Sequence, residues 1–142
     1  MIILDTDHIS LLQHPDSPEG QRLIERLTAS PEQDIVTTVI TVEEQMRGWL
    51  QVIARYRDLQ QQATYYDKLI EFVRFFSRWR ILPLQETAVQ MFRDLQQARV
   101  RIATTDLKIA AITLAYRATL LSRNARDFKQ VPELQVEDWT TP

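Results

Sequence analysis

Five acidic residues of this 142-residue sequence stand near the ends of predicted strands or at the beginnings of predicted helices. The first directly follows the apolar run at residues 1–4, and the others follow later apolar segments or open helices. They are Asp5, Glu43, Glu44, Asp106 and Asp127. In open α/β sheets, ligands bind in the crevice outside the carboxyl ends of the strands. We therefore expect these side chains to converge on one rim of a sheet.

Carboxylates gathered in a small space favour a divalent cation, because they repel one another and raise each other's pKa until a cation neutralises them. Ligand sets made only of oxygen favour Mg²⁺ or Mn²⁺, which keep several waters and bridge to phosphate oxygens. Such an ion can orient and deprotonate a water for in-line attack on a phosphodiester. The pattern therefore predicts metal-dependent phosphodiester hydrolysis without a protein nucleophile.

Each acid also has a purely structural explanation. Glu43 and Glu44 suit the first turn of a helix, where the helix dipole favours negative charge. Asp106 suits a helix N-terminus, and Asp127 suits a turn. The functional interpretation rests on all of them falling at the same end of the predicted strands. Asp7 is predicted to be the N-cap of a helix over residues 8–13, because Asp is a favoured cap residue.

The composition excludes several other kinds of site. The absence of cysteine excludes disulfides, thiolate zinc sites and cysteine nucleophiles. The two glycines are too few for a P-loop or a dinucleotide fingerprint, so no nucleotide cofactor is expected. His8 and His14 have no second metal-type residue at helical spacing, and we assign them surface or capping roles. A net charge of −2 means that RNA would need a local basic patch to bind.

Length and hydrophobic content favour one domain over residues 1–142. No apolar run reaches the length of a membrane span, and the first apolar segment is too short for a secretory signal. We therefore expect a soluble cytoplasmic protein without a membrane segment.

Strands alternate with helices along the predicted chain. Short β-branched and apolar runs predict strands over residues 1–4, 34–39, 80–83 and 118–121, with an edge strand at 134–136. Helical periodicity and cap residues predict helices over residues 8–13, 18–28, 42–54, 56–79, 86–98 and 105–116. The predicted N-caps are Ser17 or Asp16 for the second helix, Thr41 for the third, and Thr104 or Thr105 for the last. This alternation predicts βαβ units around a parallel sheet.

The apolar stretch at residues 69–79 is wider than one core-facing side of a helix needs. Two interpretations stay open at this point. The stretch forms a protein–protein surface, or the whole helix is buried.

Four segments together resemble the PIN-domain ribonucleases, most closely the VapC-type toxins of type II toxin–antitoxin pairs. They are LDTDHIS from Leu4, TVITVEEQMRG from Thr38, RIATTDLKIAA from Arg101 and LLSRNARDFKQVP from Leu120. The resemblance spans nearly the whole chain. It implies a PIN-like (Rossmann-like) three-layer α/β/α fold with a central, mostly parallel sheet of four to five short strands.

The resemblance also implies a ligand set, because members of this family use three or four acids to bind Mg²⁺ or Mn²⁺ and hydrolyse RNA. The implied catalytic metal ligands are Asp5, Glu44, Asp106 and Asp127. The spacing of the second motif, three residues after Thr41 and four before Gly48, selects Glu44 and leaves Glu43 as its neighbour. Ala103 departs from the glycine that many relatives have before the third acid, which should alter the turn more than the chemistry.

Other polar residues match supporting positions of the family. Thr6, Ser122 and Asn124 match positions that hydrogen-bond to the carboxylates or to metal waters. Basic residues near the motifs are candidates for contacts with the RNA backbone, although exposed basic residues often form only a solvated surface. These are Arg99, Arg101, Arg123, Arg126 and Lys129. The resemblance further implies a homodimer and a cognate antitoxin whose tail occupies the site, which would give residues 69–79 a purpose.

Two other functions are compatible with parts of the sequence. The D-x-D pattern at Asp5 and Asp7 superficially matches haloacid-dehalogenase-like phosphatases, in which the first Asp is a phosphorylated nucleophile. Those enzymes usually continue with a Thr and a turn that contains Gly, whereas this chain runs directly into a helix. The other alternative is a catalytically silent module that binds an antitoxin, which the intact set of four acids argues against.

Overall fold

The computed structural model describes residues 1–142. The strands are β1 (Ile2–Leu4), β2 (Ile35–Thr38), β3 (Ile81–Leu82), β4 (Thr119–Leu121) and β5 (Gln135–Glu137). The helices are α1 (Thr6–Gln13), α2 (Pro18–Ala29), α3 (Val39–Arg55), α4 (Leu59–Phe76), α5 (Glu86–Gln97), α6 (Thr104–Ala115) and α7 (Ala125–Phe128). All the predicted strands and helices are present, with ends shifted by up to three residues, and the four-residue helix α7 is additional.

The five strands form one sheet in the order β3-β2-β1-β4-β5, and every neighbouring pair runs parallel. This confirms the predicted parallel sheet and its edge strand. The chain builds outward from β1 to β2 and β3, and then crosses back to place β4 on the other side of β1. The strand order therefore reverses between β1 and β4, and such switch points are where open α/β sheets form their ligand crevices.

Side chains of the central strands alternate between two apolar cores, one on each face of the sheet. Ile3 and Leu120 belong to the core that includes residues of α5, α6 and α7. Ile2, Leu4 and Leu121 belong to the other core, with residues of α1, α2 and α4. The result is the expected three-layer α/β/α arrangement, in which short apolar strands are covered on both faces.

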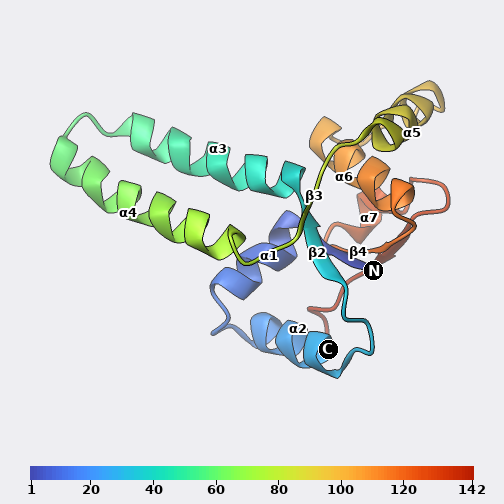
Figure 1. The fold of residues 1–142 in the computed structure, drawn as a ribbon, viewed down its shortest axis with the longest axis horizontal. Helices are drawn as coiled ribbons and strands as arrows, with labels where there is room; N and C mark the ends of the chain where they lie inside the picture. Colours follow the sequence, from blue (N-terminus) through green and yellow to red (C-terminus); the bar gives the residue numbers. More distant parts are fainter.

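Helices α3 and α4 form a hairpin that extends away from the sheet (Figure 1). At the base of this hairpin Phe72 and Phe76 of α4 are buried in the second core. On another side of the same helix, Ile70 and Val73 are 48% and 56% exposed. The alternative of a wholly buried helix is therefore wrong, because residues 69–79 divide between a core-facing and a solvent-facing side.

Two helices begin directly at the end of a strand, which moves their caps from the predicted positions. Asp5, and not Asp7, is the N-cap of α1, and its side chain accepts a hydrogen bond from the Thr6 N–H at 2.8 Å. Thr38, and not Thr41, is the N-cap of α3, and its hydroxyl accepts from the Thr41 N–H at 3.2 Å. In both places no loop follows the strand, so its final extended residue takes the cap position.

The caps of α2 and α6 differ from each other. Ser17 caps α2 as predicted, and its hydroxyl accepts from the Gly20 N–H at 3.0 Å. Helix α6 starts at Thr104 after Ala103 and has no side-chain cap, so the predicted threonine caps are wrong. Ala103 has a φ of −53°, so this turn needs no glycine.

None of the helices combines the length and the apolar composition that crossing a bilayer requires.

Candidate metal centre at the carboxyl ends of the strands

Asp5 lies at the carboxyl end of β1, the strand at which the strand order of the sheet reverses. Its side chain is held on both oxygens: Oδ1 accepts from the Thr6 N–H at 2.8 Å, and Oδ2 accepts from the Ser122 hydroxyl at 2.7 Å. Ser122 directly follows β4, so the ends of the two strands at the switch point meet through this contact. Burial, followed by the neighbouring Asp7 carboxylate, raises the pKa of Asp5 to about 7.

The loop over residues 122–124 connects Asp5 to two further acids. The Asn124 side-chain amide donates to Asp106 Oδ2 and to Asp127 Oδ2, each at 3.1 Å. The Asn124 backbone N–H donates to the Ser122 hydroxyl at 3.0 Å, which fixes the two supporting side chains relative to each other. The turn after β4 thus binds acids from β1, α6 and α7, three segments that are far apart in sequence.

Glu44 reaches the same site from the second turn of α3. Its Oε1 accepts from the Thr6 hydroxyl at 3.0 Å, so the residue after Asp5 binds the second acid. Burial, and to a smaller extent Asp106, raises the pKa of Glu44. Glu43 points elsewhere and forms an exposed ion pair with Arg47 at 3.1 Å. The structure therefore brings Glu44 into the site and leaves Glu43 outside it.

The site carries more negative charge than its own hydrogen bonds neutralise. Burial, and then the carboxylates of Asp127 and Asp7, raise the pKa of Asp106. The pKa values of Asp5, Glu44 and Asp106 are all raised, and each has a neighbouring carboxylate among the causes. Such mutual repulsion is typical of acids that are arranged for a cation.

Asp7 is the acidic residue whose place the sequence did not reveal. It lies in the first turn of α1, where its Oδ2 accepts from the Arg123 N–H at 3.0 Å and lies 3.4 Å from the Ser122 hydroxyl. Its charge acts on both Asp5 and Asp106. The available signal was the D-x-D spacing itself, which places the second Asp in the first turn of the helix that Asp5 caps.

The donor set fits a hard divalent cation. It consists of carboxylates, hydroxyls and one amide, which are the oxygen ligands that Mg²⁺ and Mn²⁺ prefer. No three carboxylate or imidazole groups are close enough to form a ready-made coordination sphere. The repulsion that Asp106 exerts on Asp5 and on Glu44 is the property that a cation would relieve.

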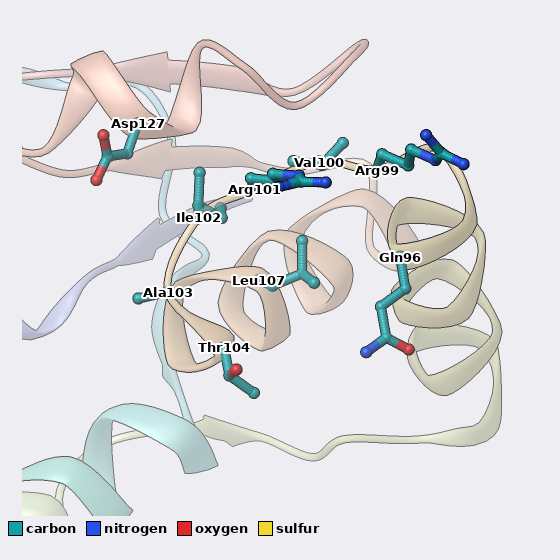
Figure 2. A pocket seen from close by; sticks show the side chains of 9 residues that line it. All are labelled: Gln96, Arg99, Val100, Arg101, Ile102, Ala103, Thr104, Leu107 and Asp127. Carbon is teal, nitrogen blue, oxygen red and sulfur yellow. The ribbon is translucent and has the colours of Figure 1, made fainter.

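A shallow hollow of about 660 Å³ lies beside the acids, between the end of α5 and the start of α6 (Figure 2). Arg99 and Arg101 line it together with Asp127, whose carboxylate points away from the two arginines. Asp127 also binds Asn124, so it borders both the hollow and the acid cluster. Two cationic side chains therefore line the same hollow as Asp127.

The remaining basic candidates are exposed near the same rim. The ion pairs of the chain that involve an arginine or lysine are formed by Arg22, Arg47, Lys68 and Arg80. The five basic residues expected near RNA are all exposed and free of such pairs; they are Arg99, Arg101, Arg123, Arg126 and Lys129. Their charge is therefore available to an anionic ligand.

Comparison with known sequences assigns a family. The family model described as PIN domain matches residues 2–134. The chain is 37% identical over 71 residues to Ribonuclease VapC of Rickettsia bellii, an alignment that covers 47% of this chain and 52% of that protein. It is 32% identical over 69 residues to Ribonuclease VapC2 of Rickettsia felis, covering 46% and 52%. In these alignments the chain spans about half the length of each ribonuclease.

Comparison with solved structures extends the likeness over the whole fold. A chain in the crystal structure of VapBC2 from Rickettsia felis, bound to a DNA fragment from the promoter, matches with a TM-score of 0.67 and 25% identity. That match covers 98% of this chain and 99% of the other. A chain in the structure of VapBC-1 from nontypeable Haemophilus influenzae matches with a TM-score of 0.72 and 22% identity, covering 99% and 100%. The second likeness concerns the fold alone.

Proposed function

The chain belongs to the PIN-domain family, and from this premise we propose that it is a Mg²⁺- or Mn²⁺-dependent endoribonuclease that acts as the toxin of a type II toxin–antitoxin pair. The names of its sequence relatives, which are ribonucleases, support this proposal. RNA is then the substrate, and the cytoplasm is where we expect the protein to meet it.

The observation that carries the proposal is the acid cluster at the switch point between β1 and β4. Asp5, Glu44 and Asp106 have raised pKa values, and the loop over residues 122–124 holds Asp5 and Asp106 together with Asp127. A cluster with only structural roles would gain stability from partners of opposite charge. Here neutral donors hold the acids and leave their charge uncompensated.

We assign the metal-binding role to Asp5, Glu44, Asp106 and Asp127. A bound Mg²⁺ or Mn²⁺ would supply activation of a water and neutralisation of charge on the phosphate. Thr6 would orient Glu44, Ser122 would orient Asp5, and Asn124 would orient the remaining two acids. These donors fix the rotamers of the carboxylates before a ligand arrives, which is the task of supporting groups around metal ligands.

Arg101, Arg123 and Arg126 are proposed to hold the phosphate backbone on the rim of the site. Arg101 lines the hollow beside Asp127, so a strand whose phosphate is at the acids can extend over this hollow (Figure 2). Such contacts position RNA without reading its sequence, because phosphates carry no base information.

The proposed partners are a cognate antitoxin and a second copy of this chain. The similar solved structures include a VapBC2 complex from Rickettsia felis, which supports the antitoxin assignment. Ile70 and Val73, the exposed apolar residues of α4, belong to the stretch that the sequence analysis associates with a partner. Covering exposed apolar side chains is a general driving force for association.

The decisive experiment incubates the purified chain, freed of any partner, with labelled total RNA in Mg²⁺ or Mn²⁺. The Asp5→Asn variant and a chelator serve as controls, and Glu43→Gln serves as a matched acid outside the site. Cleavage by wild type and Glu43→Gln, lost with Asp5→Asn and with the chelator, is the expected result. A folded, metal-loaded wild type that cleaves no RNA but still binds an antitoxin would favour the silent binding module.

A further inference from the structure

His8 is a fully buried histidine whose two ring nitrogens both have partners. Its Nδ1 lies 2.7 Å from Asp7 Oδ1, and its Nε2 lies 3.4 Å from the backbone N of Trp139. The metal-binding role proposed above does not use this residue, and the sequence assigned it a surface or capping role. Its complete burial excludes the surface role. Its position inside α1, whose caps are Asp5 and His14, excludes the capping role.

The partners of the ring identify its tautomer. The Trp139 backbone N–H can only donate a hydrogen bond, so His8 Nε2 must be the acceptor. In the tautomer with one ring proton, that proton sits on Nδ1 and is donated to Asp7 Oδ1. The Asp138 carboxylate lies 3.8 Å from Nε2, beyond hydrogen-bond distance. The ring orientation is fixed at both ends, one by the C-terminal segment and one by a carboxylate of the candidate site.

The Asp7 carboxylate links the His8 ring to the loop after β4. While Oδ1 accepts from His8, Oδ2 accepts from the Arg123 N–H at 3.0 Å. Arg123 lies between Ser122, which donates to Asp5, and Asn124, which donates to Asp106 and Asp127. The Asp7 carboxylate therefore bridges the His8 ring and the centre of the loop that holds three of the four proposed ligands.

The segment that contacts His8 is itself fixed to the body of the protein. Thr140 is buried, and its carbonyl oxygen accepts from Arg22 Nε of α2 at 2.7 Å. The Thr140 hydroxyl donates to Asp138 Oδ1 at 2.6 Å, which closes a turn around Trp139. The contact at His8 Nε2 thus depends on residues 138–140, which lie 130 or more positions further along the chain.

We propose that His8 is a positioning residue of the metal centre, which uses the C-terminal segment as its anchor and holds Asp7 so that the 122–124 loop presents the metal-binding acids correctly. This inference rests on the proposed function. His8 is buried and does not touch the acids that would hold the ion, so it acts through Asp7 and the loop alone.

The first test measures the His8 tautomer in the wild-type chain by ¹⁵N NMR of the imidazole nitrogens. The expected spectrum shows a protonated Nδ1 and an unprotonated Nε2 that lies in hydrogen-bond contact with the Trp139 amide. A protonated Nε2 with a bare Nδ1 would overturn the proposal, because that ring could not donate to Asp7. This readout requires neither metal nor activity.

The second test compares His8→Asn with His8→Leu. Asparagine places an amide N–H near the position of Nδ1 and can still donate to Asp7, whereas leucine fills the buried space without a donor. We expect His8→Leu to bind Mn²⁺ several-fold more weakly, less than the roughly 10–100-fold usual for the loss of a direct contact with a metal ligand, because His8 acts through Asp7 and the loop. It should also lower kcat for RNA cleavage while KM changes little, and His8→Asn should restore both the affinity and kcat.

His14→Leu is the matched control, because His14 is exposed and lies outside these contacts. Amide spectra report on the loop directly: the Arg123 and Asn124 signals should shift in His8→Leu and return toward wild type in His8→Asn. Equal Mn²⁺ affinity in wild type and folded His8→Leu would overturn the inference. Failure of the wild type itself to bind Mn²⁺ or cleave RNA would instead overturn the proposed function.

Discussion

At the scale of single residues, the site combines buried acids with neutral donors. Asp5 is 6% exposed and yet has no cationic partner among its hydrogen bonds. A carboxylate in this position is expensive to ionise, because burial and neighbouring charge both oppose it. A bound cation would offset the free energy of ionising Asp5. Without the cation, this free energy should be measurable as a loss of stability.

The raised pKa of Asp5, about 7, predicts a pH-dependent stability of the metal-free chain. The folded state holds this proton more tightly than the unfolded state, whose pKa lies near 3.8. The free energy of unfolding should therefore fall as pH rises from about 4 to 7, by up to about 4 kcal/mol. Asp5→Asn should remove the part of this dependence that Asp5 contributes and leave the part that comes from the raised pKa values of Glu44 and Asp106. It should also be more stable than wild type at pH 8.

Urea unfolding in the presence of a chelator at pH 5 and pH 8 would measure this difference. Glu43→Gln, which changes an exposed acid, should keep the pH dependence of the wild type. An Asp5→Asn chain that loses stability with pH as steeply as wild type would show that another group is responsible.

The Ser122 hydroxyl, 2.7 Å from Asp5 Oδ2, predicts a second effect at this scale. Ser122→Ala removes the donor and frees the carboxylate to rotate, so Mn²⁺ affinity should fall about 10–100-fold. Isothermal titration calorimetry would measure the dissociation constant, with Ser77→Ala, an exposed serine directly after α4, as the control. Unchanged affinity in Ser122→Ala would mean that the Thr6 N–H alone orients Asp5.

At the scale of secondary structure, the site depends on helices that start without an intervening loop. β2 continues directly into α3, and Thr38 serves both as the last strand residue and as the N-cap. Glu44 is six residues after Thr38, so the residue at which α3 begins determines whether the Glu44 carboxylate reaches the Thr6 hydroxyl. The cap therefore serves the geometry of the site as well as the stability of the helix.

Thr38→Val is expected to destabilise the protein by about 1 kcal/mol, because it removes the oxygen that accepts from the Thr41 N–H and leaves a buried donor unpaired. Thr38→Ser keeps the cap oxygen and should lose less. Thermal or urea unfolding of the three chains provides the measurement. A Thr38→Val chain as stable as wild type would show that the Thr38 hydroxyl does not stabilise the start of α3.

At the scale of the whole molecule, a chain of net charge −2 has no overall attraction for RNA. The exposed basic residues at the rim of the acid cluster provide a local positive charge that can attract RNA. Binding that depends on a few phosphate contacts should weaken steeply with salt, because each contact releases counterions.

Arg101→Ala should therefore weaken binding of single-stranded RNA and reduce the slope of log K against log salt by about 0.7. Fluorescence anisotropy in the Asp5→Asn background, which prevents cleavage, would measure the slope over a range of KCl concentrations. Arg57→Ala, in the exposed loop between α3 and α4, is the matched control. Equal slopes for the two variants would exclude Arg101 from contact with the backbone.

The sequence by itself determined the order of the strands and helices along the chain, the parallel sheet and the clustered acids other than Asp7. Short β-branched runs and helical periodicity are local properties, so they can be recognised without tertiary contacts. Asp5, Asp106 and Asp127 were recognised because each ends a strand or stands near a helix start. The choice of Glu44 over Glu43 came from the motif of the resembling family, and the contact of Glu44 with Thr6 agrees with it.

Only the tertiary structure decided where the chain turns and which distant groups meet. The caps at Asp5 and Thr38 follow from strands that lead straight into helices, which cap propensities cannot foresee. His8 gained its role because residue 139 returns to α1, a contact between positions 131 apart. Such long-range contacts depend on how the layers pack together, and no local sequence pattern records that packing.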